Sequence, residues 1–204
     1  MTLNSIFPRV PQSLLLLLFI FWFMPVALAN GATGHQDGTA FPHYKAIESN
    51  VTFWEKIYAT YSLNEAVIHD SDDLSKIYEV IPMLDPNLPG AAHLNSQLQK
   101  QARESYSRLL KQLSETPPVT DQEKRIAALF KGENRRQQMA LAADNVRSQT
   151  GQKERFLTGV IVSGMYMDDM KKIFRSHQLP EDLAYLPHVE SSFNTRAYSK
   201  FGAA

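Results

Sequence analysis

The chain has no cysteine among its 204 residues. Disulfide bonds are therefore excluded, and so is a lipid anchor attached at a processed cysteine. Because no covalent cross-link is available, the folded chain must be stabilised by packing of its apolar residues, which form 44% of the sequence. A chain of this length can bury one sizeable core, or form a small domain with an extension.

The sequence also lacks a net charge, since 21 basic residues balance 21 acidic ones. No strong electrostatic field is expected to attract nucleic acid, so we predict no nucleic-acid partner. No phosphate-binding glycine loop occurs. No two histidines have metal-ligand spacing; they are His35, His43, His69, His93, His177 and His188. We therefore predict no cofactor and no metal site, and we treat His188 as non-catalytic.

The N-terminus has the pattern of a secretory signal peptide. Arg9 precedes a short apolar run at 13–24, and the small residues Ala27-Leu28-Ala29 follow it. We predict cleavage after Ala29, which gives a signal peptide at 1–29 and a periplasmic protein. The alternative is an inner-membrane anchor at 13–29, with peripheral association of the rest. Residues 30–43 are rich in glycine and polar residues and are predicted to be a flexible linker.

The remaining sequence shows no convincing apolar–polar alternation of the kind that marks strands, so we predict an all-α fold with a helical N-terminal region at 44–150. One helix is expected from Thr52, with Phe53, Ile57 and Tyr61 on one stripe. Helices are also expected at 94–115, 121–130 and 134–149. A short helix capped by residues 70–73 is predicted to carry Leu74, Ile77, Tyr78 and Ile81.

The longest apolar face is predicted for a helix at 152–178. Its members recur at spacings of three and four residues; they are Phe156, Val160, Gly164, Met167, Met170 and Phe174. The sequence VIV at 160–162 could also form a strand. A helix is favoured because the period of three to four continues on both sides of it.

A single carboxylate, Glu190, lies among apolar residues near the end of the sequence. In a helix it would share a face with Leu183, Leu186 and Phe193. Pro187 would either kink this helix or begin a new one. In both cases we expect apolar surroundings that favour the protonated carboxyl, as a general acid requires. The alternative is a surface glutamate in a first helical turn.

The runs ESSFN (190–194), AYS (197–199) and GAA (202–204) resemble the signature of lytic murein transglycosylases. These enzymes belong to glycoside hydrolase family 23 and have a lysozyme-like fold. The approach LPEDLAYLPHVE (179–190) is similar to the membrane-bound lytic transglycosylase D branch. The resemblance implies that residues 151–204 are the N-terminal part of a transglycosylase domain containing its first helices, since the family motif continues into Gly-Leu-Trp-Gln.

The resemblance implies a peptidoglycan lytic transglycosylase active in cell-wall remodelling. Glu190 would protonate the β-1,4 glycosidic oxygen between N-acetylmuramic acid and N-acetylglucosamine, and then take the proton of the C6 hydroxyl to close a 1,6-anhydro ring. It further implies substrate-binding roles for Ser191, Tyr198, Ser199 and Gly202. The expected partner is the glycan strand, and a monomer is expected.

Two departures bear on this expectation. Thr195 replaces the proline usual after Phe-Asn, and the second wall of the sugar groove is not encoded in residues 179–204. Because that wall is missing, we expect residues 1–204 alone to show no or very weak turnover on murein glycan. The alternative functions are a catalytically inactive peptidoglycan- or partner-binding helical protein that uses 44–150, and a signal-anchored structural helical protein.

Overall fold

The computed structural model describes residues 41–194. The predicted signal peptide and residues 30–40 of the linker lie outside this range, as do Tyr198, Ser199 and Gly202. The elements in chain order are η2 (Lys45–Ile47), α2 (Glu48–Ala59), β1 (Glu65–Asp70), β2 (Ile77–Pro82), α3 (Ala91–Glu115), α4 (Asp121–Ala127), α5 (Arg135–Ala142), β3 (Val146–Thr150), α6 (Lys153–Ser163), α7 (Met167–Ser176), η3 (Glu181–Tyr185) and α8 (Leu186–Glu190). The described part is mostly helical, but its three strands contradict the prediction of a purely all-α fold.

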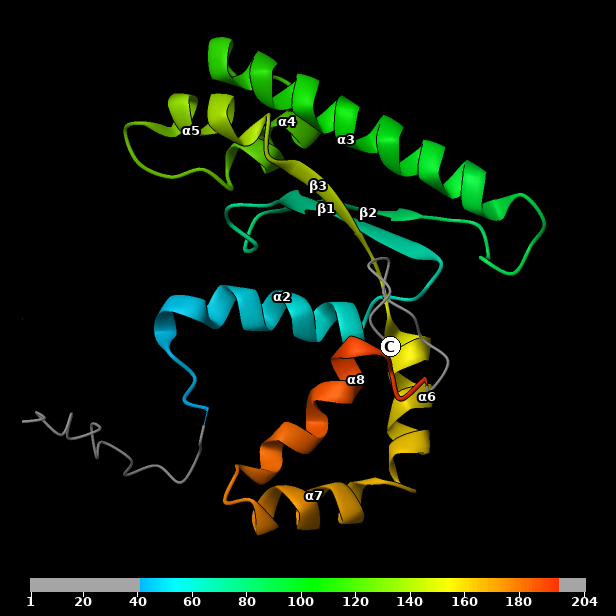
Figure 1. Ribbon diagram of the computed structural model, residues 1–204. Coiled ribbons are helices and arrows are strands. Elements are labelled where there is room, and N and C mark those ends of the chain that lie inside the picture. Colours follow the sequence, from blue (N-terminus) through cyan, green and yellow to red (C-terminus); the bar gives the residue numbers. More distant parts are fainter. Residues whose placement is uncertain (1–40, 195–204) are drawn as a thin grey trace, which may run out of the picture. The chain divides into compact units, whose positions relative to one another are not determined.

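The strands form one antiparallel sheet in the order β2-β1-β3, with β1 in the centre (Figure 1). Helices cover both faces of this sheet. On one face α2 contributes Phe53 and Ile57 to a cluster with Val67 of β1. On the other face Ile68 joins a larger cluster with residues of α3, α4 and α5. Neighbouring residues of β1 therefore point into two different cores.

The predicted short helix at 74–81 is wrong, because Ile77 to Pro82 form strand β2. The register with β1 shifts between Ile68 and His69, which leaves Tyr78 as the extra residue of a bulge. Ile77 and Val80 then face the α2 side, while Tyr78 and Ile81 face the α3 side. The helix-like spacing of Leu74, Ile77, Tyr78 and Ile81 therefore comes from a bulged strand whose apolar residues pack on both faces of the sheet.

The acidic cluster at 70–73 forms the β1–β2 turn and caps no helix. Asp70 is buried, and its Oδ1 accepts hydrogen bonds from the backbone N–H groups of Asp72 (2.8 Å) and Asp73 (3.4 Å). The hydroxyl of Tyr78 donates to Oδ2 at 3.1 Å. Burial raises the pKa of Tyr78, and the nearby carboxylate of Asp70 raises it further. These bonds fix the hairpin that places β2 beside β1.

The helices predicted at 94–115 and 121–130 are present as α3 and α4. Thr120 caps α4 in a reciprocal capping box with Glu123, which explains its sharp start. The helix predicted at 134–149 is only half correct. It ends at Ala142, and Val146 to Thr150 form the edge strand β3.

The helix predicted at 152–178 is divided into α6 and α7 around Gly164. Four members of its predicted apolar face are half-buried, namely Phe156, Met167, Met170 and Phe174, and two are exposed, namely Val160 and Gly164. The buried residues of α6 are Gly159 and Ser163. Several large apolar residues of α6, α7 and the turn between them are exposed, namely Leu157, Val160, Ile161, Met165 and Ile173. The helical interpretation of 160–162 is confirmed, and α6 packs through the small residues Gly159 and Ser163 and through the ring of Phe156.

The pH dependence of stability is expected to include a contribution from His69. This side chain is buried against Phe53, and burial lowers its pKa, opposed by the carbonyl and carboxylate of Asp70 and assisted by Arg147. The unfolded chain therefore binds more protons below the ordinary histidine pKa of about 6.5, so stability is complete above that pH and falls as the pH decreases.

Urea unfolding between about pH 5 and pH 7.5 measures this effect. We expect His69→Gln to flatten the slope, whereas His93→Gln, at an exposed position of α3, should leave it unchanged. Equal slopes in wild type and His69→Gln would contradict the assignment. The lowered carboxyl pKa values of Asp73 and Glu154 act at more acidic pH and do not compete in this range.

Candidate functional site

The predicted catalytic residue, Glu190, is the last residue of α8. Pro187 lies in the first turn of this helix, where a missing N–H costs little because such groups have no partner within the helix. Of the two alternatives for Pro187, the start of a new helix is therefore correct. Glu190 is exposed, and so is Leu186 of the same predicted face. The prediction of a carboxylate held against apolar surface is thus wrong for this structure.

The turn after Glu190 has an unusual backbone conformation. Ser192 and Phe193 both have left-handed φ angles, 51° and 56°. The turn is closed by hydrogen bonds from the N–H groups of Ser191 and Phe193 to the carbonyl of Pro187, at 3.1 and 3.2 Å. The ring of Phe193 also stacks on that of Tyr166. Strained conformations of this kind persist where surrounding contacts enforce them, as they often do at functional sites.

His188 holds α8 against α6. Its side chain is only 7% exposed, and its Nδ1 lies 3.1 Å from the carbonyl oxygen of Tyr185, which can only accept. Nδ1 therefore carries a proton, and Nε2 bonds the hydroxyl of Ser163 at 3.1 Å. The ring contacts those of Phe156 and Phe193. The prediction that His188 is non-catalytic fits this role as an internal support of the Glu190 turn.

Gly159 lets the backbone of α6 come close to the same turn. A Cβ at this position would lie 3.0 Å from both Cα and the carbonyl oxygen of Ser192. A side chain here would therefore push the turn away from α6. Gly159 and Ser163 are four residues apart on one face, so the turn and His188 rest on a strip of small residues.

Replacing Gly159 by alanine is expected to loosen the Glu190 turn selectively. Relieving the contact with Ser192 should cost about 1–3 kcal/mol locally. Amide hydrogen exchange at 188–194 should become about tenfold faster or more, with the β-sheet unaffected. Gly164→Ala is the matched control, because a Cβ there meets Ile161 at an ordinary 3.5 Å. Unchanged exchange in Gly159→Ala would show that the close approach does not hold the turn.

Tyr58 brings α2 to this site, although it lies 131 residues before Val189 in the sequence. Its hydroxyl donates to the carbonyl of Val189 at 3.5 Å. Burial raises the pKa of Tyr58, and the negative charge of Glu190 raises it further, so the two side chains are electrostatic neighbours. Only a weak sequence signal points to this residue, namely that Trp54 and Tyr58 lie beside the core stripe of α2.

A groove of about 660 Å³ lies between α2, α6 and α8. We call it the α2 groove; it is lined by Ile47, Asn50, Val51, Trp54, Glu55, Tyr58, Ala59, Phe156 and Val189. Three rings follow one another along it, with centroids 6.0 Å apart for Trp54–Tyr58 and 5.5 Å apart for Tyr58–Phe156. We call these three residues the aromatic row. Trp54 is 41% exposed, so its ring is available to a ligand.

A smaller hollow of about 250 Å³ is lined by Tyr166, Met170, Pro187, Ser191, Phe193 and Asn194. Val189 belongs to the α2 groove and Ser191 belongs to this hollow. Glu190 stands between these two residues in the sequence and is itself a lining residue of neither pocket.

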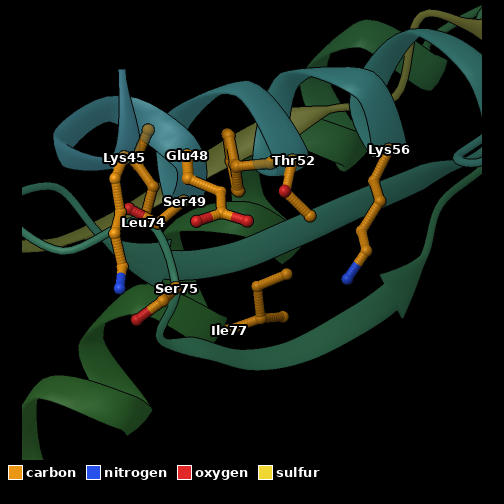
Figure 2. A pocket seen from close by; sticks show the side chains of 9 residues that line it. Lys45, Glu48, Ser49, Thr52, Lys56, Leu74, Ser75 and Ile77 are labelled. Atoms are coloured by element: carbon orange, nitrogen blue, oxygen red, sulfur yellow. The ribbon is translucent and has the colours of Figure 1, made fainter. Parts of the chain in front are cut away.

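A third crevice, of about 480 Å³, lies along the face of α2 that carries Glu48, Thr52 and Lys56 (Figure 2). Lys45, Glu48 and Lys56 stand at its rim, and its apolar wall includes Leu74 and Ile77. It shares no residue with the α2 groove. This crevice is therefore separate from the Glu190 site.

Within residues 41–194, no three side chains of the His, Asp and Glu types form a metal-binding group. No helix in the same range combines the length and apolar character that crossing a bilayer requires. Of the predicted site residues, Glu190 and Ser191 are brought together at the turn. The other three lie outside the described residues.

Known proteins offer no assignment for this site. No family model, curated protein or solved structure matches this chain. The resemblance of residues 179–204 to transglycosylases therefore stays a prediction from a short motif. The site itself is an exposed carboxylate on a turn that packs against Gly159 and His188, with the α2 groove at Val189 and the smaller hollow at Ser191.

Proposed function

We propose that this protein is a peptidoglycan lytic transglycosylase in which Glu190 acts first as general acid and then as general base. The observation that carries the proposal is the position of Glu190. It is exposed, it ends α8, and its neighbours in the sequence, Val189 and Ser191, line the α2 groove and the smaller hollow. The motif at 190–204 supports the same chemistry, and Ser191 is close enough in sequence to orient the carboxylate or the sugar.

The reaction needs one carboxyl group. Glu190 gives its proton to the glycosidic oxygen, so that the bond between muramic C1 and that oxygen breaks and the glucosamine hydroxyl leaves. The resulting carboxylate takes the proton of the C6 hydroxyl, whose oxygen bonds C1 and closes the 1,6-anhydro ring. The carboxyl group is restored, and no water is consumed.

The same proposal places the protein with its substrate in the periplasm. Export would follow from the signal peptide predicted at 1–29, with an inner-membrane anchor as the alternative. The glycan strand is the proposed partner, and the protein is proposed to act as a monomer without a cofactor.

The nature of the soluble products tests the proposal. The chain is incubated with isolated murein sacculi. The released muropeptides are separated by chromatography, and their masses are determined by mass spectrometry. We expect products that end in 1,6-anhydro-N-acetylmuramic acid, each lighter by one water than the hydrolysis product. Products with a free reducing end would indicate a hydrolase and contradict the proposal.

If no product is released, the binding of wild type and of Glu190→Gln to isolated sacculi is compared. In that case, equal binding of wild type and Glu190→Gln to sacculi in a pull-down would support the alternative of an inactive peptidoglycan-binding protein. Binding without cleavage is therefore distinguished from catalysis by the same preparation.

A further inference from the structure

We propose that α2 supplies saccharide-binding residues to the Glu190 site, namely Trp54 and Tyr58, whose rings stack against sugar rings on one side of the bond that is cleaved. This inference rests on the proposed function. The family resemblance places the catalytic domain at residues 151–204. The inference extends the site to α2, which lies outside that range.

The position of the aromatic row relative to Glu190 is fixed by the packing of α2. Phe53 and Ile57 are 2% and 0% exposed and anchor one face of α2 on the sheet. Trp54 comes directly after Phe53, and Tyr58 comes directly after Ile57. Their rings therefore point away from the sheet and line the α2 groove. The rings are therefore held on a helix that does not need to move when a ligand arrives.

Contacts with α6 and α8 connect this face of α2 to the catalytic turn. The ring of Tyr58 lies against that of Phe156, and its hydroxyl reaches the carbonyl of Val189, the residue before Glu190. Burial raises the pKa of Tyr58, and the negative charge of Glu190 raises that pKa further. A sugar ring stacked on Tyr58 would therefore lie next to the carboxylate.

The chemistry of the α2 groove suits a saccharide. One face of a pyranose ring presents C–H groups that pack on an aromatic ring, while its hydroxyls need hydrogen-bonding groups at the edge. Asn50, Glu55 and the hydroxyl of Tyr58 provide such groups around an otherwise apolar lining. The volume of about 660 Å³ lies within the usual range for sites of small ligands.

The tryptophan content of the chain provides a direct measurement. Its two tryptophans are Trp22 and Trp54, so Trp22→Phe leaves Trp54 as the sole indole. The full chain carrying Trp22→Phe and Glu190→Gln is titrated with a tetramer of N-acetylglucosamine. We expect a saturable shift of Trp54 emission to shorter wavelength, because a stacked sugar removes water from a ring that is now 41% exposed.

Substitutions separate the aromatic row from the rest of the site. Trp54→Ala and Tyr58→Ala should each weaken tetramer binding, measured by calorimetry, about tenfold or more, since both remove a stacking ring. Tyr58→Phe keeps the ring and should retain most of the affinity. Tyr44→Ala, at an exposed tyrosine outside the α2 groove, is the control. Circular dichroism of each variant establishes that it is folded.

Three outcomes would overturn the inference: no binding of the tetramer, binding without a change in Trp54 emission, or unchanged affinity in folded Trp54→Ala. If the α2 groove binds an apolar protein segment and not the tetramer, the result counts as the first outcome. Failure of the proposed function has a different signature, namely tetramer binding that depends on Trp54 while the wild type releases no anhydro product. If Trp54→Ala forms anhydro product with an unchanged KM, the proposed function stands and only the sugar-binding role of the aromatic row is refuted.

Discussion

Replacing Glu190 by glutamine is expected to lower the rate of anhydro-muropeptide release at least about 100-fold, the usual loss when a general acid–base group is removed. Glutamine has nearly the same shape as glutamate, but it can neither protonate the glycosidic oxygen nor take the C6 hydroxyl proton. Because Glu190 is exposed, the substitution should change the free energy of unfolding by no more than about 0.5 kcal/mol.

A second glutamine substitution provides the control. Glu133 is exposed in the connection between α4 and α5, so Glu133→Gln should keep full activity. If Glu190→Gln retains more than about a tenth of the wild-type rate, a different group performs the proton transfers.

The same variant should change an independent property of the site. The charge of Glu190 is one of the causes that raise the pKa of Tyr58, so its removal should lower that pKa toward the ordinary tyrosine value. Absorbance titration of tyrosinate, with Tyr58→Phe used to assign the signal, measures this shift. No shift in Glu190→Gln would show that α2 and the catalytic turn are not neighbours, whatever the activity.

The sheet could not be predicted from sequence because its central strand has no polar face. Residues Ala66 to Asp70 are all buried, since α2 covers one face of β1 and α3 the other. A strand of this kind shows no alternation, and six residues are too few to exclude a helix or a loop. β2 was still more misleading, because its bulge at Tyr78 converts a strand pattern into spacings of three and four.

The roles proposed for Glu190 and Ser191 come from a motif of residues that are close together in the sequence. The surfaces around them depend on packing between distant segments, which a motif does not contain. The motif could not identify Tyr58, because the contact between Tyr58 and Val189 depends on how α2 packs against α8. The burial of Gly159 and Ser163 was equally hidden, since a hydrophobicity pattern gives no weight to small residues that allow close backbone approach.

Replacing Gly151 by alanine is expected to destabilise the fold by about 3 kcal/mol or more. A Cβ at this position would overlap the carbonyl oxygens of Tyr61 and Ser62. Those are backbone atoms, so no rotation of a side chain can relieve the overlap. The requirement here is for space, because Gly151 joins β3 to α6 directly against the segment that follows α2.

Hydrogen bonds around Gly151 increase the loss of folding free energy expected for this substitution. The N–H of Gly151 donates to the carbonyl of Glu65 at 3.0 Å. The N–H of Gln152 donates to the carbonyl of Ile57 at 2.8 Å, and that of Lys153 to the carbonyl of Tyr61 at 3.2 Å. Moving the chain to admit a methyl group would stretch bonds of buried or half-buried groups, which cannot all exchange to water. The same bonds link the connection between β3 and α6 to α2 and to the start of β1.

Urea unfolding of Gly151→Ala measures this loss, with Gly164→Ala as the control. Gly164 adopts a helical conformation and has room for a methyl group, so that variant should be unchanged or stabilised by about 0.4–1 kcal/mol. Wild-type stability in Gly151→Ala would mean that the connection between β3 and α6 is looser than these contacts require. Because α6 and the segment after α2 meet at this connection, such a result would also weaken the case for a fixed distance between Tyr58 and Glu190.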